Sequence, residues 1–285
     1  MAQFTNYATL SYNGVTLTSN TVTGELLESV NISKTSTAVS YGIGDDLTYI
    51  VTLTNSSSAP MTNLTVTDDL GGYLYDGTTV YPLQYQSNSL RYFVNGVLQP
   101  TPTITAGPPL SVSGVNIPAG GNVELVYETL VTAYAPPAAG GTITNTASVT
   151  GARLITSVTA TETLPAETGA ELQITKSISP AAVSAGDLLT YTFLIENTGN
   201  TSVTEADNVV LSDTFDPILT DITVTYNGTP WTVTTNYTYD EATGVFSSVA
   251  GDMTVAAATY TQNADGIWTV VPGTATLNIS GTVQP

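Results

Sequence analysis

Hydrophobic and polar residues alternate one by one along most of the chain. The alternation is clearest in residues 46–55 (DLTYIVTLTN), 122–131 (NVELVYETLV) and 274–283 (TATLNISGTV), and Gly, Pro, Asn and Asp separate such runs. A period of two places successive side chains on opposite faces of a strand, and no stretch carries the apolar stripe of a helix. The pattern therefore predicts an all-β protein of short, half-buried strands.

The pattern occurs twice. Residues 33–55 align without a gap on residues 175–197, with a constant offset of 142. After a three-residue insertion, NLTVTDDL (63–70) meets NVVLSDTF (208–215). Each unit offers roughly seven or more short strands, which favours two tandem immunoglobulin-like β-sandwiches. We expect domain one over residues 29–165 and domain two over residues 166–285.

The two units differ at their ends. In domain one the strand at 122–131 is followed by a Pro-Pro loop and a further strand at 142–151, whereas in domain two the equivalent of 122–131 is the last strand of the sequence. Residues 4–19 lie on residues 143–158 without a gap, with Thr5-Asn6 on Thr144-Asn145. We predict that domain two lacks its last strand and that residues 1–28 are a donor strand and its connector.

A sandwich without one strand exposes an apolar groove and unpaired edge groups, which a donated strand would cover. Insertion into the chain's own domain two would require the short connector to fold back across a whole domain. Donation to another copy avoids this, with Phe4, Ala8 and Leu10 as apolar anchors. Because such a head-to-tail contact does not close on itself, it predicts a homopolymeric filament.

The two lysines of the sequence occupy equivalent positions. Residues two apart in a strand share a face, so Lys34 shares a face with the apolar Val30 and Ile32, and Lys176 does so in domain two. The same rule predicts that four further polar residues face a core, namely Asn145, Asn6, Asp68 and Asp213. The pattern thus predicts two sets of one Lys, one Asn and one Asp whose side chains face a core.

The run SAGDLLTYTFLIENTGNT (184–201), the VTD or LSD strand end and the TNTASV strand resemble the "domain of unknown function eleven" repeat of bacterial surface proteins. The resemblance covers most of residues 29–285. It implies pilin-like or adhesin-like sandwiches in which a buried Lys and Asn join in an isopeptide bond beside a carboxyl group. The implied sets are Lys34, Asn145 and Asp68 within domain one, and Lys176, Asp213 and Asn6 of another subunit.

These residue types suit that chemistry. Burial disfavours the ammonium form of lysine and the ionised form of aspartate, so a neutral amine could attack the Asn side chain while Asp68 or Asp213 carries protons. A buried Lys–Asp salt bridge hydrogen-bonded to Asn would produce the same pattern. Asp45 and Asp187 are reserve acids, although their Gly-Asp context is typical of turns.

Composition excludes several other functions. The chain has 23 acidic and four basic residues, no His and a net charge of −19, which argues against nucleic-acid binding and docking to anionic membranes. No apolar run is long enough to insert into a membrane. No Cys is present, and we expect no metal centre, no cofactor and no enzyme activity on an external substrate. Acidic clusters at 44–46, 68–72 and 239–244 could bind calcium loosely, but solvated loops are the simpler interpretation.

Two function classes remain. The first is a structural subunit of an extracellular fibre on a bacterial cell or an endospore. The second is a surface adhesin or carbohydrate-binding module, in which Trp231 and Trp268 could form a sugar platform. Residues 1–20 have neither a basic nor an apolar signal-peptide region, so we expect assembly inside a sporulating mother cell and release on lysis.

Overall fold

The computed structural model describes residues 2–26, 30–151, 154 and 156–284. The chain divides into two compact units, one formed by residues 1–136 and 140–166 and the other by residues 137–139 and 167–285. We call residues 2–26 the N-terminal arm, residues 30–166 domain one and residues 167–284 domain two. The predicted boundary between residues 28 and 29 lies outside the described residues.

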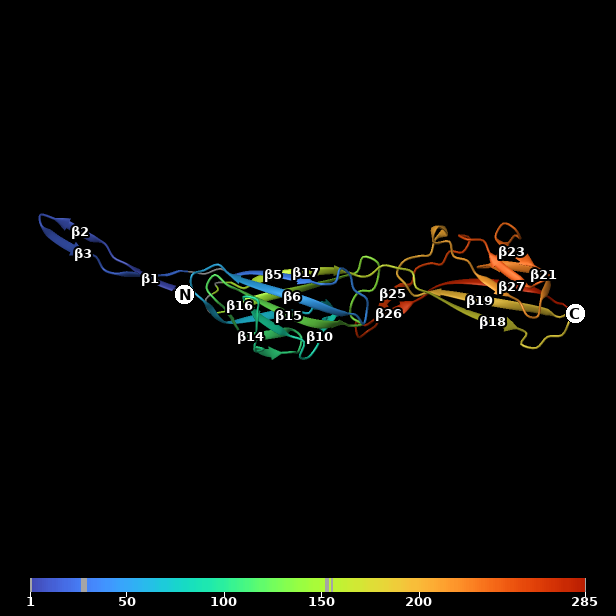
Figure 1. The fold of residues 1–285 in the computed structure, drawn as a ribbon, viewed down its shortest axis with the longest axis horizontal. Coiled ribbons are helices and arrows are strands. Elements are labelled where there is room, and N and C mark those ends of the chain that lie inside the picture. The colour runs from blue at the N-terminus through green and yellow to red at the C-terminus, as the bar shows by residue number, and fades with distance from the viewer. Residues whose placement is uncertain (1, 27–29, 152–153, 155, 285) are drawn as a thin grey trace. The chain divides into compact units, whose positions relative to one another are not determined.

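Domain one is a β-sandwich of two antiparallel sheets (Figure 1). The first sheet has the order β12-β11-β15-β6-β5, and β10 also pairs with β15. The second has the order β13-β14-β7-β16-β17, and β8 and β9 form a separate ribbon. The first sheet contains β5 (Val30–Ser36), β6 (Asp46–Asn55), β10 (Leu83–Tyr85), β11 (Arg91–Val94), β12 (Val97–Gln99) and β15 (Asn122–Val131). The other strands are β7 (Met61–Asp68), β8 (Tyr73–Tyr75), β9 (Thr78–Val80), β13 (Thr103–Thr105), β14 (Leu110–Ile117), β16 (Thr142–Thr150) and β17 (Val158–Pro165).

Strand alternation builds the core of domain one. In β6 the residues Leu47, Tyr49, Val51 and Leu53 are buried, and the intervening residues are only partly buried or exposed. The strands β16 and β17 form a hairpin that closes the second sheet, and β17 lies beside β5 of the first sheet (Figure 1). The prediction of an all-β, immunoglobulin-like sandwich is confirmed.

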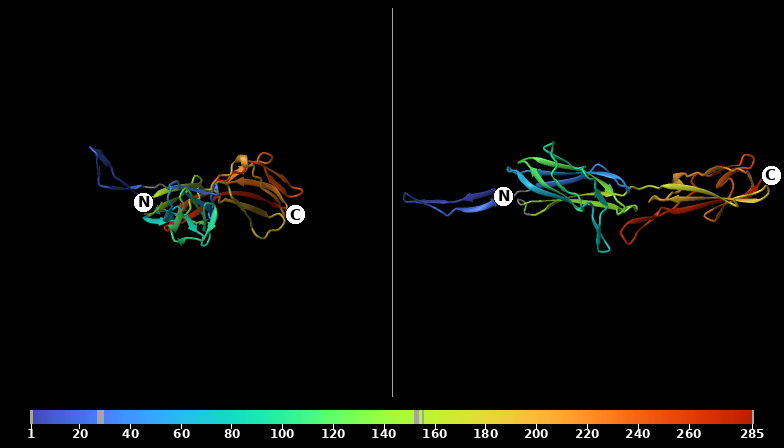
Figure 2. Two further views of the ribbon diagram at one scale, coloured as in Figure 1. Left: turned by 60° about the vertical axis from the view of Figure 1, so that its left-hand side comes forward. Right: turned by 90° about the horizontal axis from the view of Figure 1, so that it is seen from below.

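Domain two has one five-stranded sheet of the order β18-β19-β27-β21-β22 and a three-stranded sheet of the order β20-β24-β23 (Figure 2). A hairpin of β25 and β26 and the short 3-10 helix η1 (Glu205–Asp207) complete it. The strands are β18 (Leu172–Ser179), β19 (Leu188–Asn197), β20 (Ser212–Thr214), β21 (Leu219–Tyr226), β22 (Thr229–Trp231), β23 (Tyr237–Asp240), β24 (Val245–Ser248), β25 (Thr259–Gln262), β26 (Trp268–Val271) and β27 (Gly273–Val283).

The internal repeat is visible in single hydrogen bonds. The buried Asn55 donates from Nδ2 to the carbonyl oxygens of Ala59 (2.8 Å) and Pro118 (3.0 Å). Its equivalent Asn197 donates to those of Thr201 (2.8 Å) and Ala256 (3.1 Å). Each Asn thus satisfies two loop carbonyl groups, which would cost free energy if they were buried without partners.

The repeat fails at one sheet edge. In domain one β7 pairs with both β14 and β16. In domain two its equivalent β20 pairs with β24 alone, and the described residues of this domain contain no counterpart of the β16–β17 hairpin. One flank of β20 is therefore an open strand edge.

The N-terminal arm is a hairpin and not a single strand (Figures 1 and 2). β1 (Ala2–Asn6) pairs with β4 (Val22–Leu26), and β2 (Thr9–Tyr12) pairs with β3 (Val15–Thr18). The tip is Asn13-Gly14, with φ of 46° and 77°, as a type I′ turn requires. The segment that we expected to be a mere connector thus contains two strands.

Candidate cross-linking site and acceptor groove

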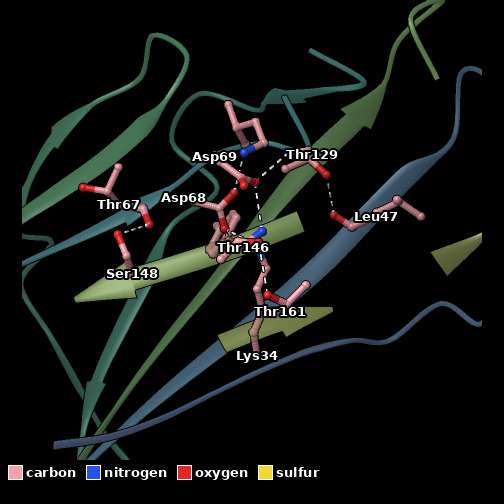
Figure 3. Close-up of polar contacts among 12 residues, drawn as sticks. Lys34, Leu47, Thr67, Asp68, Asp69, Thr129, Thr146, Ser148 and Thr161 are labelled. Carbon is pink, nitrogen blue, oxygen red and sulfur yellow. Dashed lines mark hydrogen bonds and ion pairs between the residues drawn. The ribbon is translucent and has the colours of Figure 1, made fainter. Parts of the chain in front are cut away.

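Domain one holds a buried ion pair between its two sheets. Lys34 of β5 and Asp68, the last residue of β7, are joined through Nζ and Oδ2, and their side chains are 0% and 3% exposed. Figure 3 shows the Lys34 side chain directed from its strand toward Asp68. A buried charge is costly unless it is paired, so each of these two residues depends on the other.

Asp68 accepts further hydrogen bonds. The Tyr127 hydroxyl of β15 donates to Oδ2, and the backbone N–H of Leu70 donates to Oδ1 at 2.9 Å. Burial raises the pKa of the Tyr127 hydroxyl well above its ordinary value, and the charge of Asp68 adds to this shift. Tyr127 therefore stays protonated and remains a donor. The sequence prediction missed this residue, because a tyrosine in an alternating strand is typical of a core position.

The lysine of this site favours its neutral form more than a solvated lysine does. Burial lowers the pKa of the Lys34 amine, and the attraction of Asp68 opposes this shift without cancelling it. The amine nitrogen also lies 4.8 Å from the ring centroid of Tyr49. A lysine with a lowered pKa is a better nucleophile near neutral pH, since only the neutral amine carries a free electron pair.

Asn145 is the third member of the predicted set. It lies on β16 two residues before Ala147, the direct cross-strand partner of Asp68, and is fully buried. Its side chain also lies near the Tyr49 hydroxyl, whose pKa is raised by burial. Neither Nδ2 nor Oδ1 of Asn145 has a hydrogen-bond partner. Such a buried unsatisfied group costs about 1–3 kcal/mol, so this amide is destabilising as it stands.

The equivalent pair in domain two is open to water. Lys176 and Asp213 are joined through Nζ and Oδ2, but their side chains are 39% and 19% exposed. Lys176 lies 4.4 Å from the ring centroid of Tyr191, the equivalent of Tyr49. Ile279 stands opposite Tyr191 where Tyr127 stands opposite Tyr49, so Asp213 lacks the tyrosine hydroxyl.

An apolar groove surrounds this open pair. Leu172, Ile174 and Ile178 of β18, which share the face of Lys176, are 39%, 58% and 48% exposed, whereas Val30 at the equivalent edge of domain one is 2% exposed. Beside them lies a cavity of about 490 Å³. Its lining includes Lys176, Ile178, Val183, Leu189, Tyr191 and Pro217. Domain two therefore exposes residues that the fold buries in domain one.

The predicted donor residues lie on the N-terminal arm and are exposed. Phe4 and Leu10 are 55% and 63% exposed, and Asn6 and Ala8 are exposed as well. The structure thus brings Lys34 together with Asp68, and Lys176 together with Asp213. Asn6 lies on β1, in the arm.

The reserve acids occupy turns. Oδ2 of Asp45 accepts a hydrogen bond from the backbone N–H of Gly42 (2.6 Å), and Oδ2 of Asp187 accepts one from Ser184 (2.7 Å). Among the described residues no group of three or more acidic, His or Cys side chains could hold a metal ion. The Trp231 ring stacks on Tyr226 at 5.0 Å between centroids. In the part of the chain that the structure covers, no helix is long and apolar enough to cross a membrane.

No protein-family model and no curated protein matches the chain. Among solved structures it is similar to the major pilin subunit of Bacillus cereus, with 12% identity over 97% of this chain and 74% of that one and a TM-score of 0.38. It is also similar to a collagen-binding domain of a Staphylococcus aureus adhesin (14% identity, 47% and 96% covered, TM-score 0.32). A third similar structure is a family 123 glycoside hydrolase from Clostridium perfringens, with 16% identity over 49% of this chain and 27% of that one and a TM-score of 0.31. Likenesses this low assign no function to the chain.

Proposed function

We propose that the chain is the structural subunit of a head-to-tail homopolymer, an extracellular fibre on a bacterial cell or endospore. One observation carries the proposal. Domain two exposes an apolar inner face and an open strand edge where domain one holds its closing hairpin, and the chain begins with a copy of the first strand of that hairpin. The arm of one copy would complete domain two of another by strand addition.

Domain one supplies the template for this contact. There β16 pairs with β7 so that Ala147 stands opposite Asp68 and Val149 opposite Val66. At the equivalent positions, Ala8 of the arm would stand opposite Asp213 of the other copy, and Leu10 would stand opposite its Leu211. Asn6 of the arm would then take the position of Asn145, next to Lys176. The residue-by-residue match therefore defines a register as well as a binding groove.

The sites support covalent cross-linking. In domain one the neutral amine of Lys34 attacks Cγ of Asn145, the Nζ–Cγ bond forms, the Cγ–Nδ2 bond breaks and ammonia leaves. Asp68, held by Tyr127, passes the amine proton to the departing nitrogen, so no other reactant is required. The unsatisfied amide of Asn145 supports this reaction, because its nitrogen is expelled. In domain two the same reaction would join Lys176 to Asn6 of another copy, after docking has excluded water.

Electron microscopy combined with cysteine cross-linking tests the assembly. The purified protein should form filaments in negative stain. The chain contains no cysteine, so Leu10→Cys in one preparation and Leu211→Cys in another introduce single thiols. Under oxidation the mixture should give a disulfide-linked dimer. Leu10→Cys mixed with Val66→Cys is the matched control and should give none, because domain one already holds its own hairpin. Absence of filaments, or equal cross-linking in both mixtures, would contradict the proposal.

A further inference from the structure

We propose that the arm enters domain two of the other copy as an intact two-stranded hairpin, so that β4 docks together with β1 and β2. This inference rests on the proposed function and identifies the donated element. In strand donation by a single strand, β4 would separate from β1 and remain outside the groove.

Over β1 and β4 the arm reproduces the pairing of the hairpin that closes domain one. In domain one Ile143 pairs with Leu164 and Asn145 pairs with Glu162. In the arm Phe4 pairs with Gly24 and Asn6 pairs with Val22. Since Phe4 and Asn6 match Ile143 and Asn145, β4 stands in the register of β17. From the sequence we predicted only a donor strand and a connector in this segment.

The two strands of the arm also fit each other. A Cβ atom at Gly24 would lie 2.4 Å from Cζ of Phe4, so the Phe4 ring occupies the space that a side chain at residue 24 would take. The equivalent residues Ile143 and Leu164 of domain one are both buried. One large ring over a glycine thus replaces two aliphatic side chains. This packing exists only while β1 and β4 stay paired.

Domain two has room for the second strand. In domain one β17 lies beside β5, the edge strand that carries Lys34 (Figure 1). The equivalent strand β18 pairs with β19 alone, and all its residues are exposed. A single inserted strand would supply a counterpart of β16 but none of β17. The flank of β18 would then stay uncovered.

The charge of the arm favours docking on an acidic partner. The whole chain has a net charge of −19, but residues 2–26 contain a single charged side chain, that of Glu25 in β4. Two copies repel each other, since like charges on both partners oppose association. Residues 2–24 of the hairpin carry no charged side chain, so this part can enter an acidic domain without burying an unpaired charge. Charged side chains are absent from all of β2 and β3 and from Val22, Thr23 and Gly24 of β4.

A disulfide staple tests whether the hairpin docks intact. Thr5 and Thr23 are cross-strand partners in the arm, and their domain-one equivalents Thr144 and Thr163 are exposed, with hydroxyl oxygens 3.3 Å apart. The variant Thr5→Cys/Thr23→Cys should close a disulfide on the outward face of the hairpin. We expect the oxidised and the reduced protein to polymerise to the same extent. The variant Thr144→Cys/Thr163→Cys is the control for a staple of the same geometry in an already closed sheet.

The outcomes separate the two proposals. If the reduced variant polymerises and the oxidised one does not, the hairpin inference is wrong while strand donation stands. If neither wild type nor reduced variant polymerises, the proposed function fails as well. Hydrogen exchange adds a direct reading, because an isolated two-stranded hairpin is marginally stable and its amides exchange quickly. On assembly the amides of residues 22–26 should become as protected as those of residues 2–6, and protection of residues 2–6 alone would overturn the inference.

Discussion

Lys34 and Lys176 have equivalent neighbours but differ in how far their side chains are exposed to solvent. Each forms an ion pair with an Asp and lies over the ring of an equivalent Tyr. The Lys34 side chain is fully buried, whereas that of Lys176 is 39% exposed. The difference follows from the closing hairpin of β16 and β17, which domain one contains and which has no counterpart among the described residues of domain two. The comparison teaches that the burial of such an ion pair depends mainly on whether a closing hairpin covers it, and to a smaller extent on neighbours such as Tyr127, which Ile279 replaces in domain two.

The largest effect is expected from removing the first strands of the arm. Deletion of residues 1–14 should abolish filaments and leave a soluble monomer with both domains folded, because residues 4–14 are exposed and take no part in the described core of domain one. Negative-stain microscopy and circular dichroism measure the two properties. Filaments formed by the truncated protein would refute donation by the arm.

Lysine substitutions should separate the two predicted bonds. Wild-type monomer should weigh one ammonia less than its sequence, and Lys34→Ala should have its full sequence mass. Lys176→Ala should keep the deficit in the monomer but yield fibres that dissociate in hot detergent. Asn6→Ala and Asp213→Asn should do the same, since backbone pairing and apolar anchors remain. Intact-mass spectrometry and denaturing electrophoresis provide the readouts, and a ladder that persists without Lys176 would disprove the cross-link between copies.

Stability should respond unequally to the same pair of substitutions. In an Asn145→Ala background, which keeps the ion pair but cannot form the bond, Lys34→Ala leaves Asp68 buried without its cation and should cost about 3–5 kcal/mol in the unfolding of domain one. Lys176→Ala removes a half-exposed pair and should cost about 0–1 kcal/mol in the unfolding of domain two of the monomer. Urea unfolding gives both values when the Lys34→Ala/Asn145→Ala variant is compared with Asn145→Ala, and the Lys176→Ala monomer with wild-type monomer. Equal costs would show that burial is not what distinguishes the sites.

The Tyr127 hydroxyl should account for a smaller part of the difference. Tyr127→Phe removes a hydrogen bond to a charged acceptor and should lower the stability of domain one by about 1.5–3 kcal/mol. It should also slow the loss of ammonia, since Asp68 is then held less firmly. Ile279→Tyr is the reciprocal change and should speed cross-linking in fibres. Time-resolved mass spectrometry checks both, and unchanged rates would exclude a role for the hydroxyl.

The smallest effect is a dependence on pH. Burial lowers the pKa of Lys34 in the folded state below its ordinary value of 10.5. Between the lowered pKa and 10.5 the unfolded chain binds more protons at this residue than the folded one does, so stability should rise with pH in that window. Below the lowered pKa this contribution is lost.

The Asn145→Ala variant isolates this effect, because it keeps the ion pair but cannot form the bond. Its unfolding free energy should be measured below pH 10.0, the ordinary pKa of tyrosine, since Tyr49 and Tyr127 have raised pKa values and act in the opposite direction above it. The slope should vanish when Lys34→Met is added. A slope that survives this addition would assign the effect to another group.

Strand alternation and the internal repeat are strong one-dimensional signals, and they predicted the sandwich fold and directed each lysine and aspartate toward a core. The grouping of Lys34 with Asp68 and of Lys176 with Asp213 was implied by the family resemblance. The sequence did not predict Tyr127 as a donor to Asp68, since that contact joins strands of different sheets and a core tyrosine has the same pattern. It also predicted only a donor strand and its connector in residues 1–28, although Asn13-Gly14 between two alternating runs is a recognised hairpin signal. Cross-strand register requires coordinates.

The open edge of β20 gives any filament built in this way a direction. At one terminus a free arm would be left over, and at the other an unfilled groove, so the two termini would differ chemically and could grow at different rates. A copy without its arm would still accept an incoming hairpin and would end the chain on one side only. Small amounts of such a copy would act as a terminator and set the mean filament length, much as a monofunctional monomer does in a condensation polymer.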